Sequence, residues 1–211
     1  MKRKTGPVGA IVRTDMRFRF RRTAGVVTLL LIAAGVYFIV PDIGTGRTLM
    51  QIEGRRVLYN SAAVAFGTGM FCALFVNMLG YYLVSNSFRR DLISRTGFVI
   101  AATPVTNLQY ILGKFFGNVL YLTAVALTCM LSAMVMFLIR GEGALQPFVF
   151  LGIYAWMVLP GIAFCSAIAL AFESLPALSG RFGDVLYFFI FAAFLGAPAA
   201  LMENGGRGQW L

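Results

Sequence analysis

The sequence contains no histidine and only three cysteines, so it lacks the side chains on which many catalytic and metal sites depend. Without histidine, both the commonest general base and the usual metal ligand are missing. Cys72, Cys129 and Cys165 fall in three separate apolar segments with no close partner in sequence. This placement predicts small packing residues instead of a disulfide or zinc framework. We therefore expect neither a metal nor a cofactor.

Catalytic carboxylates are also scarce, because the chain has eight Asp and Glu residues and no long apolar segment contains two of them. No Ser-His, Cys-His or two-carboxylate arrangement is visible. Gly113-Lys114 lacks both the following Ser or Thr and the preceding glycine of a P-loop. We expect that the chain is not an enzyme, and the composition argues against an intramembrane enzyme in particular. Any nucleotide hydrolysis would require a site on another chain.

Charge is sparse as well, at 12% of residues against 59% hydrophobic residues. Ordinary soluble domains carry about 25% charged residues. The apolar residues form five continuous runs, and each can cross about 30 Å of hydrocarbon as a helix that rises 1.5 Å per residue. We expect an all-α, polytopic transmembrane helix bundle in a single domain, residues 1–211, with spans at about 24–40, 57–84, 115–139, 148–172 and 185–202. Pro160 and Pro198 fall within the last two runs and predict kinks.

The basic residues predict the orientation of these spans. With the N-terminus in the cytoplasm, the inside segments contain 13 of the 18 Lys and Arg residues, while the acidic residues divide evenly. This asymmetry follows the positive-inside rule and predicts a multi-pass protein of the plasma, or inner, membrane with a cytoplasmic N-terminus. The formal net charge is +10, and the basic residues that produce it cluster beside the spans. Membrane lipid is therefore the expected partner, and nucleic acid is not.

The segment before the first span has the spacing of an interfacial helix over about 11–22. Val12, Met16 and Phe20 recur every four residues, and arginines follow on the adjoining face. This pattern is typical of a helix that lies in the membrane interface. The alternative is a basic anchoring tail with no further role. A cleaved signal peptide is disfavoured because no small-residue cleavage site follows Val40, so the first run is expected to be retained.

The segment between the second and third spans is the most distinctive. Its apolar residues over about 91–102 share one helical face, which predicts a short helix at the cytoplasmic surface. Thr103-Pro104 follows, and Thr is a good N-cap while Pro is a good first helical residue. We expect one helix to end near Ala102, and another to begin at Pro104 and to run through Gly113-Lys114 into the third span.

At these residues the chain resembles the permease subunits of ABC-2 type ATP-binding-cassette transporters. The matching features are Arg90-Asp91, the following apolar helix, Thr103-Pro104-Val105-Thr106, and Gly113-Lys114. The resemblance implies that the loop helix is a coupling helix, which docks into a separate ATP-binding-cassette ATPase subunit. Asp91 and Arg95 would be its charged contacts, and Thr103 and Pro104 its fixed corner. It also implies a homo- or heterodimer with a second permease, and it favours export.

Two departures from that family are visible. Its permeases usually have six spans, whereas five are expected here, so the chain would be a fragment of a longer permease or an atypical half. The Arg89-Arg90-Asp91 start is also more basic than the usual acid-rich version. A different class of function remains open, because any short loop between spans needs a capped turn and inside positive charge. In that alternative the protein is a non-transporting membrane scaffold or assembly protein that docks a cytoplasmic partner.

Small and polar residues inside the runs point to helix packing. Gly113-x-x-x-Gly117 and the stripe that begins at Gly161 would let helices approach closely, within one chain or between two copies. Several polar residues could line a pathway, although Ser and Thr often bond to their own helix and Asn often bridges two helices. Packing is the favoured interpretation for each of them: Asn77, Asn118, Thr123, Thr128, Ser132 and Ser166.

Overall fold

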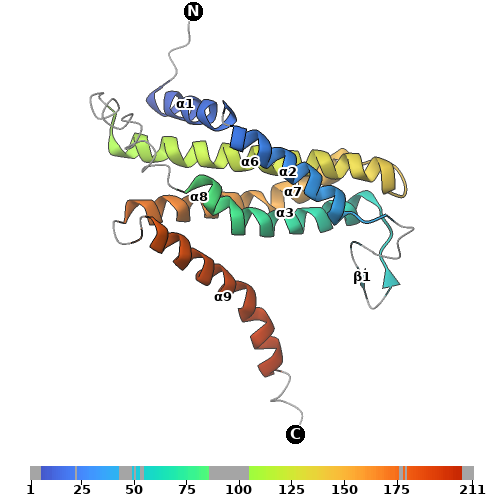
Figure 1. The fold of residues 1–211 in the computed structure, drawn as a ribbon. Coiled ribbons are helices and arrows are strands. Elements are labelled where there is room, and N and C mark those ends of the chain that lie inside the picture. Colours follow the sequence, from blue (N-terminus) through green and yellow to red (C-terminus); the bar gives the residue numbers. More distant parts are fainter. Residues whose placement is uncertain are drawn as a thin grey trace, which may run out of the picture.

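The computed structural model of this chain describes residues 6–21, 23–42, 49, 51–52, 55–85, 105–175, 178 and 180–205, and the side chains among them except those of 24, 51–56 and 198–205. The described elements are helices, apart from one short ladder, as the all-α prediction requires (Figure 1). They are α1 (Pro7–Arg21), α2 (Thr23–Ile39), β1 (Gln51–Ile52), β2 (Arg55–Arg56), α3 (Ser61–Val84), α6 (Asn107–Arg140), α7 (Pro147–Met157), α8 (Leu159–Ser174) and α9 (Arg181–Gly205). The two strands pair antiparallel.

Three helical stretches within the described residues are long and apolar enough to cross a membrane. They are Ser61–Val84, Asn107–Arg140 and Pro147–Ser174, which correspond to the second, third and fourth predicted spans. A fourth is reached if Pro7–Arg21 and Gly25–Ile39, which meet at 69°, are counted as one bent span. The chain is therefore a multi-pass membrane protein, and the first and fifth spans stay predictions.

The fourth predicted span is interrupted at Val158, where α7 ends and α8 begins. Pro160 lies in the first turn of α8, where its missing N–H removes no helical hydrogen bond. Bonds on both sides of the interruption are kept, since the Val158 N–H donates to the Tyr154 carbonyl and the Val158 carbonyl accepts from Ile162, both at 2.9 Å. The kink predicted near Pro160 thus appears as a one-residue break. By contrast, α9 continues through Pro198 as one helix.

The start of α6 differs from the prediction. Val105 and Thr106 precede the helix, which begins at Asn107, so a helix beginning at Pro104 is wrong by three residues. Thr106 and Gln109 form a capping box: the Gln109 N–H donates to Thr106 Oγ1 at 3.3 Å, and the Thr106 N–H donates to Gln109 Oε1 at 3.2 Å. A cap at Thr103 would have Thr106 three residues later, which cannot complete such a box. From Asn107 the helix runs unbroken through Gly113 and Lys114.

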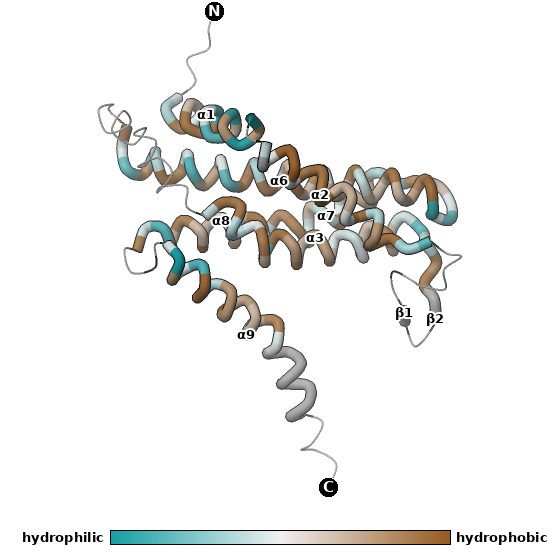
Figure 2. The backbone as a smooth tube through the Cα atoms, viewed as in Figure 1, coloured by the Kyte–Doolittle hydropathy of each residue, from teal (hydrophilic) through white to brown (hydrophobic). Residues whose placement is uncertain are grey.

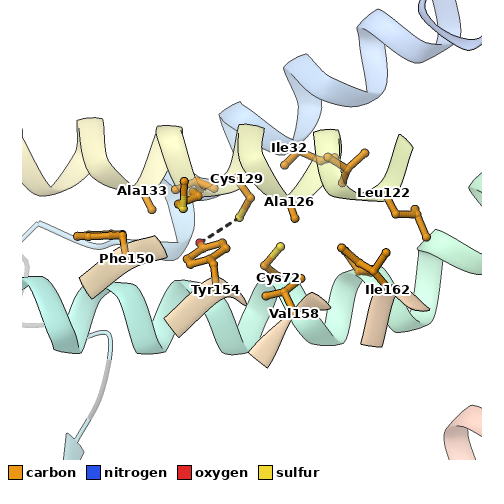
Figure 3. Close-up of a cluster of buried hydrophobic side chains, with 14 of the residues drawn as sticks. Ile32, Cys72, Leu122, Ala126, Cys129, Ala133, Phe150, Tyr154, Val158 and Ile162 are labelled. Atoms are coloured by element: carbon orange, nitrogen blue, oxygen red, sulfur yellow. Dashed lines mark hydrogen bonds between the residues drawn. The ribbon is translucent and has the colours of Figure 1, made fainter. Parts of the chain in front are cut away.

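The core is a narrow apolar seam between α2, α3, α6, α7 and α8 (Figure 3). Leu122, Phe150 and Ile162 are fully buried there. Around the seam many large apolar side chains are exposed, such as Phe38 and Trp156. Along the chain, Figure 2 shows hydrophobic residues in the middle of the helices and hydrophilic ones toward the ends of the bundle. An exposed apolar surface around a packed seam is what a helix bundle in lipid requires.

The two ends of the bundle are each tied by contacts between successive segments. At one end Ser61 Oγ donates to the Ala144 carbonyl at 2.9 Å, and the Glu142 N–H donates to the Tyr59 carbonyl at 2.8 Å. At the other end α1 meets the last turn of α3 and the first turns of α6 (Figure 1). The described residues just before α3 and those between α6 and α7, which the charge count places outside, thus share one end, and α1 and the start of α6, which it places inside, share the other.

The last helix leaves the bundle. Figure 1 shows α9 diverging from the other helices after its first turns. Those turns are held by Tyr82, whose hydroxyl donates to the Asp184 carbonyl at 2.9 Å, and by Tyr187, whose ring stacks on that of Tyr81 with centroids 3.9 Å apart. Farther along, Phe189 and Phe194 are exposed. In this chain, α9 is anchored at its start and uncovered beyond it.

Candidate functional site

Charged side chains are buried where α1 crosses the first turns of α6. Asp15, Arg19 and Lys114 are each 5% exposed or less. Arg19 Nε donates to Asp15 Oδ2 at 2.7 Å, and Lys114 Nζ donates to Asp15 Oδ1 at 3.3 Å. The two oxygens of one carboxylate therefore hold two cations, one from each helix. Such a group is stable only when all its members are present, because each charge has lost its water.

Arg19 extends this group to a third helix. Its Nη2 donates to Asn118 Oδ1 on α6 at 2.6 Å, and its Nη1 donates to the carbonyl of Leu83, in the last turn of α3, at 3.3 Å. Its guanidinium also lies over the ring of Tyr121, 5.0 Å from the centroid. One side chain thus joins α1, α3 and α6. We call Asp15, Arg19, Lys114 and Asn118 the ionic cluster.

Two glycines of α6 allow this close approach. A Cβ at Gly113 would lie 2.8 Å from Ile11 Cγ2, and a Cβ at Gly117 would lie 3.2 Å from Asp15 Oδ2. The contacts advance by four residues on each helix, so α1 runs parallel to α6 at this contact. The Gly113-x-x-x-Gly117 stripe therefore packs against the chain's own first helix. The spacing alone had left open whether it packs within one chain or between two copies.

Gly161 has a comparable position between α8 and α3. A Cβ there would lie 2.6 Å from Asn77 Nδ2, and that amide donates to the Ala73 carbonyl of its own helix at 2.8 Å. Cys165, one turn later, donates its thiol to the Val76 carbonyl at 3.7 Å. This second small-residue stripe also packs within the chain. Asn77 is thus occupied in helix packing.

The residues assigned to the coupling loop, Asp91, Arg95, Thr103 and Pro104, lie outside the described residues, as does the helix predicted over 91–102. The described parts on either side of the loop both lead to the ionic cluster. On one side α3 ends at Val84, one residue after the carbonyl that Arg19 holds. On the other side α6 begins at Asn107 and reaches Lys114 two turns later.

The ionic cluster was not predicted from the sequence. The pattern in 11–22 placed Val12, Met16 and Phe20 on the apolar face of an interfacial helix, yet Asp15 and Arg19 are the residues buried on α1, and Phe20 is 38% exposed. One signal in the sequence could have pointed to the cluster: residues 1–22 contain eight basic residues and a single acidic residue, Asp15. It also stands four residues before Arg19, the spacing of a helical ion pair.

A second polar group crosses the middle of the bundle. Tyr154 Oη donates to Thr68 Oγ1 at 3.1 Å and lies 3.6 Å from Cys129 Sγ (Figure 3). Thr68 in turn donates to the Val64 carbonyl at 2.6 Å. These are hydroxyl and thiol contacts without a carboxylate, so they pack α3, α6 and α7 together and supply no acid-base pair. Among the described residues there is no group of three or more potential metal ligands.

Two of the polar residues singled out in the sequence, Asn118 and Ser166, are buried without a full set of partners. Within the described part of the chain, the Asn118 amide nitrogen and the Ser166 hydroxyl have no hydrogen-bond partner, although both residues are completely buried. Asn118 is nonetheless engaged through its oxygen, which accepts from Arg19. It bridges two helices, in agreement with the packing interpretation. Thr128 bonds back to the Ala124 carbonyl of its own helix at 2.9 Å.

Comparison with family models, curated proteins and solved structures finds no match to this chain. The functional argument therefore depends on the chain's own residues: the ionic cluster, the capped start of α6 and the loop that these flank.

Proposed function

We propose that this chain is the membrane-spanning permease subunit of an ATP-driven transporter of the ABC-2 type, with export as the direction of transport. ATP hydrolysis resides in a separate ATP-binding-cassette subunit, which docks on the loop at 89–106. The observation that carries the proposal is that Arg19 joins α1, the end of α3 and the start of α6 in one buried group. These are the elements that a force on the loop would reach first.

The length of α6 supports a role as a lever. Its 34 residues span about 51 Å at 1.5 Å per residue, which exceeds the hydrocarbon core by about 20 Å. We place this extra length at the end of α6 that contains Lys114 and Asn118. Arg140 is the last residue at the other end, where its side chain contacts Tyr37 of α2. α1 then braces the projecting part of the helix, and a movement of the loop is passed to α1, α3 and α6 together.

In this proposal the α1 end of the bundle is cytoplasmic, in the plasma (inner) membrane, as the positive-inside count suggests. α2 and α9 complete five spans. A transport path requires a second permease, identical or different, and the exposed aromatic residues of α9 are available to such a partner or to lipid. The alternative, a scaffold that docks a cytoplasmic partner without transport, uses the same loop but needs no coupled movement of the helices.

The test is co-purification with the ATPase. The pair Asp91→Asn and Arg95→Gln, and separately Pro104→Ala, are expected to weaken the association by tenfold or more, because they remove the loop's charged contacts and its corner. Arg13→Gln is the matched control, since Arg13 is an exposed charge on α1 outside the loop. Equal retention of the ATPase in all variants, with thermal stability unchanged, would contradict the assignment of the loop.

A second measurement separates transport from scaffolding. In a coupled permease, trapping the ATPase in its ATP-bound form changes the reactivity of single cysteines placed along α6, and Asp91→Asn with Arg95→Gln abolishes this change. In a scaffold, the partner binds and the cysteine reactivities do not respond to nucleotide. Protease or labelling maps that place 89–106 outside the cell would exclude both readings.

A further inference from the structure

An apolar groove of about 490 Å³ opens between α2, α3 and α6. Its walls include Ile32, Gly35 and Val36 from α2, and Phe71 and Phe75 from α3. Apart from Thr28 and the two thiols of Cys72 and Cys129, all of its lining side chains are hydrocarbon. A cavity of this chemistry does not hold ordered water, because it offers no polar partners.

The groove has the length of one lipid leaflet. On α2 it extends from Thr28 to Ile39, which is about 16 Å of helix, or roughly half of the 30 Å hydrocarbon core. On α3 it ends at Leu83, whose carbonyl is held by Arg19 of the ionic cluster. One end of the groove therefore lies at the level of the buried charges. The other end lies near the middle of α3 and α6, at Phe71 and Cys129, and at the last residue of α2, Ile39.

The dimensions decide between possible occupants. An occupant that fills the groove along its whole length must therefore be long and narrow. The volume divided by the length leaves a cross-section of about 30 Å², which suits one extended hydrocarbon chain.

The charge near the polar end indicates which lipid. Arg13, Arg17 and Arg21 are exposed and recur every four residues on α1, on the side away from the residues that contact α6. Arg21 ends α1, and Thr28 of the groove follows seven residues later on α2, within about 10 Å along a helix. Arginines at this level attract the phosphate of an anionic headgroup.

We propose that this groove binds one acyl chain of an anionic phospholipid from the leaflet on the α1 side, with the lipid phosphate at Arg17 and Arg21. The lipid fills the gap between α2 and the rest of the bundle. This proposal does not depend on transport or on an ATPase, so it stands or fails separately from the proposed function.

Gly35 offers a direct way to block the groove. A Cβ at Gly35 would meet no atom within 4 Å, so Gly35→Leu projects a side chain into the open groove without a clash. Gly152 on α7 is the matched control, because a Cβ there also meets nothing within 4 Å and the residue does not line the groove. Both changes replace a helical glycine with the same residue, so their effects on helix propensity are equal.

The experiment purifies the full chain in a mild detergent and counts retained lipid by native mass spectrometry. The expected result is about one phosphatidylglycerol per chain in the unmodified protein and in Gly152→Leu, and at least a tenfold lower occupancy in Gly35→Leu. Equal retention in Gly35→Leu and Gly152→Leu would overturn the proposal. So would equal retention of phosphatidylcholine and phosphatidylglycerol when both are supplied to delipidated protein, since that result indicates surrounding lipid only.

The headgroup contact has its own test. Arg17→Gln with Arg21→Gln should abolish the preference for phosphatidylglycerol over phosphatidylcholine, whereas Arg181→Gln, an exposed charge at the same end, should leave it unchanged. An unchanged preference in the double variant would refute the phosphate site. Maleimide labelling provides an internal readout: phosphatidylglycerol should slow modification of Cys72 and Cys129, which line the groove, relative to Cys165, which does not. Equal protection of all three thiols would contradict the location.

Discussion

The first and last helices are opposites in composition and in packing. α1 is rich in arginine, yet it lies tightly against α6 and buries two of its charged residues. α9 is rich in phenylalanine, yet it packs through its first turns and then leaves the bundle (Figure 1). In lipid, apolar side chains gain little from packing on each other, because the surrounding chains are equally apolar. Association therefore depends on small residues, hydrogen bonds and charge pairs. α1 makes all three kinds of contact with α6, whereas the small residues in the outer part of α9, such as Ala193 and Gly196, are exposed.

The largest effect should come from removing the carboxylate that holds α1. Asp15→Ala leaves Arg19 and Lys114 buried without their counter-ion, and we expect a loss of about 3–5 kcal/mol in the free energy of unfolding. The measurement is unfolding in detergent micelles, followed by circular dichroism. Adding Lys114→Met should recover part of the loss. Arg17→Met, which removes an exposed charge from the same helix, is the control and should change stability by less than about 0.5 kcal/mol.

The glycine contacts should give the next largest effect. Gly117→Ala adds a methyl group 3.2 Å from the Asp15 carboxylate, and Gly113→Ala adds one 2.8 Å from Ile11. Overpacking of this kind costs about 1–3 kcal/mol. Gly152→Ala has open space and should stabilise the helix by up to about 1 kcal/mol. Thermal unfolding of the three variants side by side tests the comparison, and a destabilised Gly152→Ala would show that helix propensity does not decide the sign.

The start of α6, on which α1 packs, should show an effect of intermediate size. Thr106→Ala removes an N-cap hydrogen bond and should cost about 1 kcal/mol, expressed as faster amide hydrogen exchange in the first turn of α6. Thr103→Ala should leave that turn unaffected, because the cap is at Thr106. If Thr103→Ala instead has the larger effect, the helix begins at Pro104, as the Thr103-Pro104 pair predicted.

The smallest effect should be found in the outer part of α9. Tyr187→Phe removes the hydroxyl that donates to the Asn77 carbonyl and should cost about 1 kcal/mol, whereas Phe194→Ala should change the unfolding free energy by less than about 0.5 kcal/mol. Hydrogen exchange along α9 supplies a second readout, with protection expected to fall after Tyr187. A large destabilisation by Phe194→Ala in the single chain would contradict the view that this part of α9 is uncovered.

The apolar runs predicted the helices well where the pattern was long and continuous. The second run, 57–84, matches α3, and the fourth, 148–172, matches α7 and α8 together, with the break next to Pro160. The boundary at Pro104 was missed because two threonines three residues apart are both good caps, and Gln109 decides between them. That distinction was present in the sequence and required a check of the residue three positions after each candidate.

The packed face of α1 could not be predicted in the same way. The partners of Arg19 are 64 and 99 residues away along the chain. Gly113 and Gly117, which contact Ile11 and Asp15, are also far from these residues in the sequence. Periodicity within 11–22 identifies an amphipathic helix and implies that its polar residues face water. In the structure the charged residues Asp15 and Arg19 are instead the buried ones, because α6 and α3 supply opposite charge, an amide and a carbonyl.

The sequence by itself determined that this chain is a set of membrane-crossing helices, because long uncharged segments in lipid must satisfy their backbone hydrogen bonds internally. It also determined that Gly113 and Gly117 permit a close neighbour. Only the tertiary structure decided that the neighbour is α1, that Asp15 is shared by Arg19 and Lys114, and that an apolar groove remains beside α2. These features arise from contacts between side chains that are far apart in the sequence, and local sequence patterns do not specify such contacts.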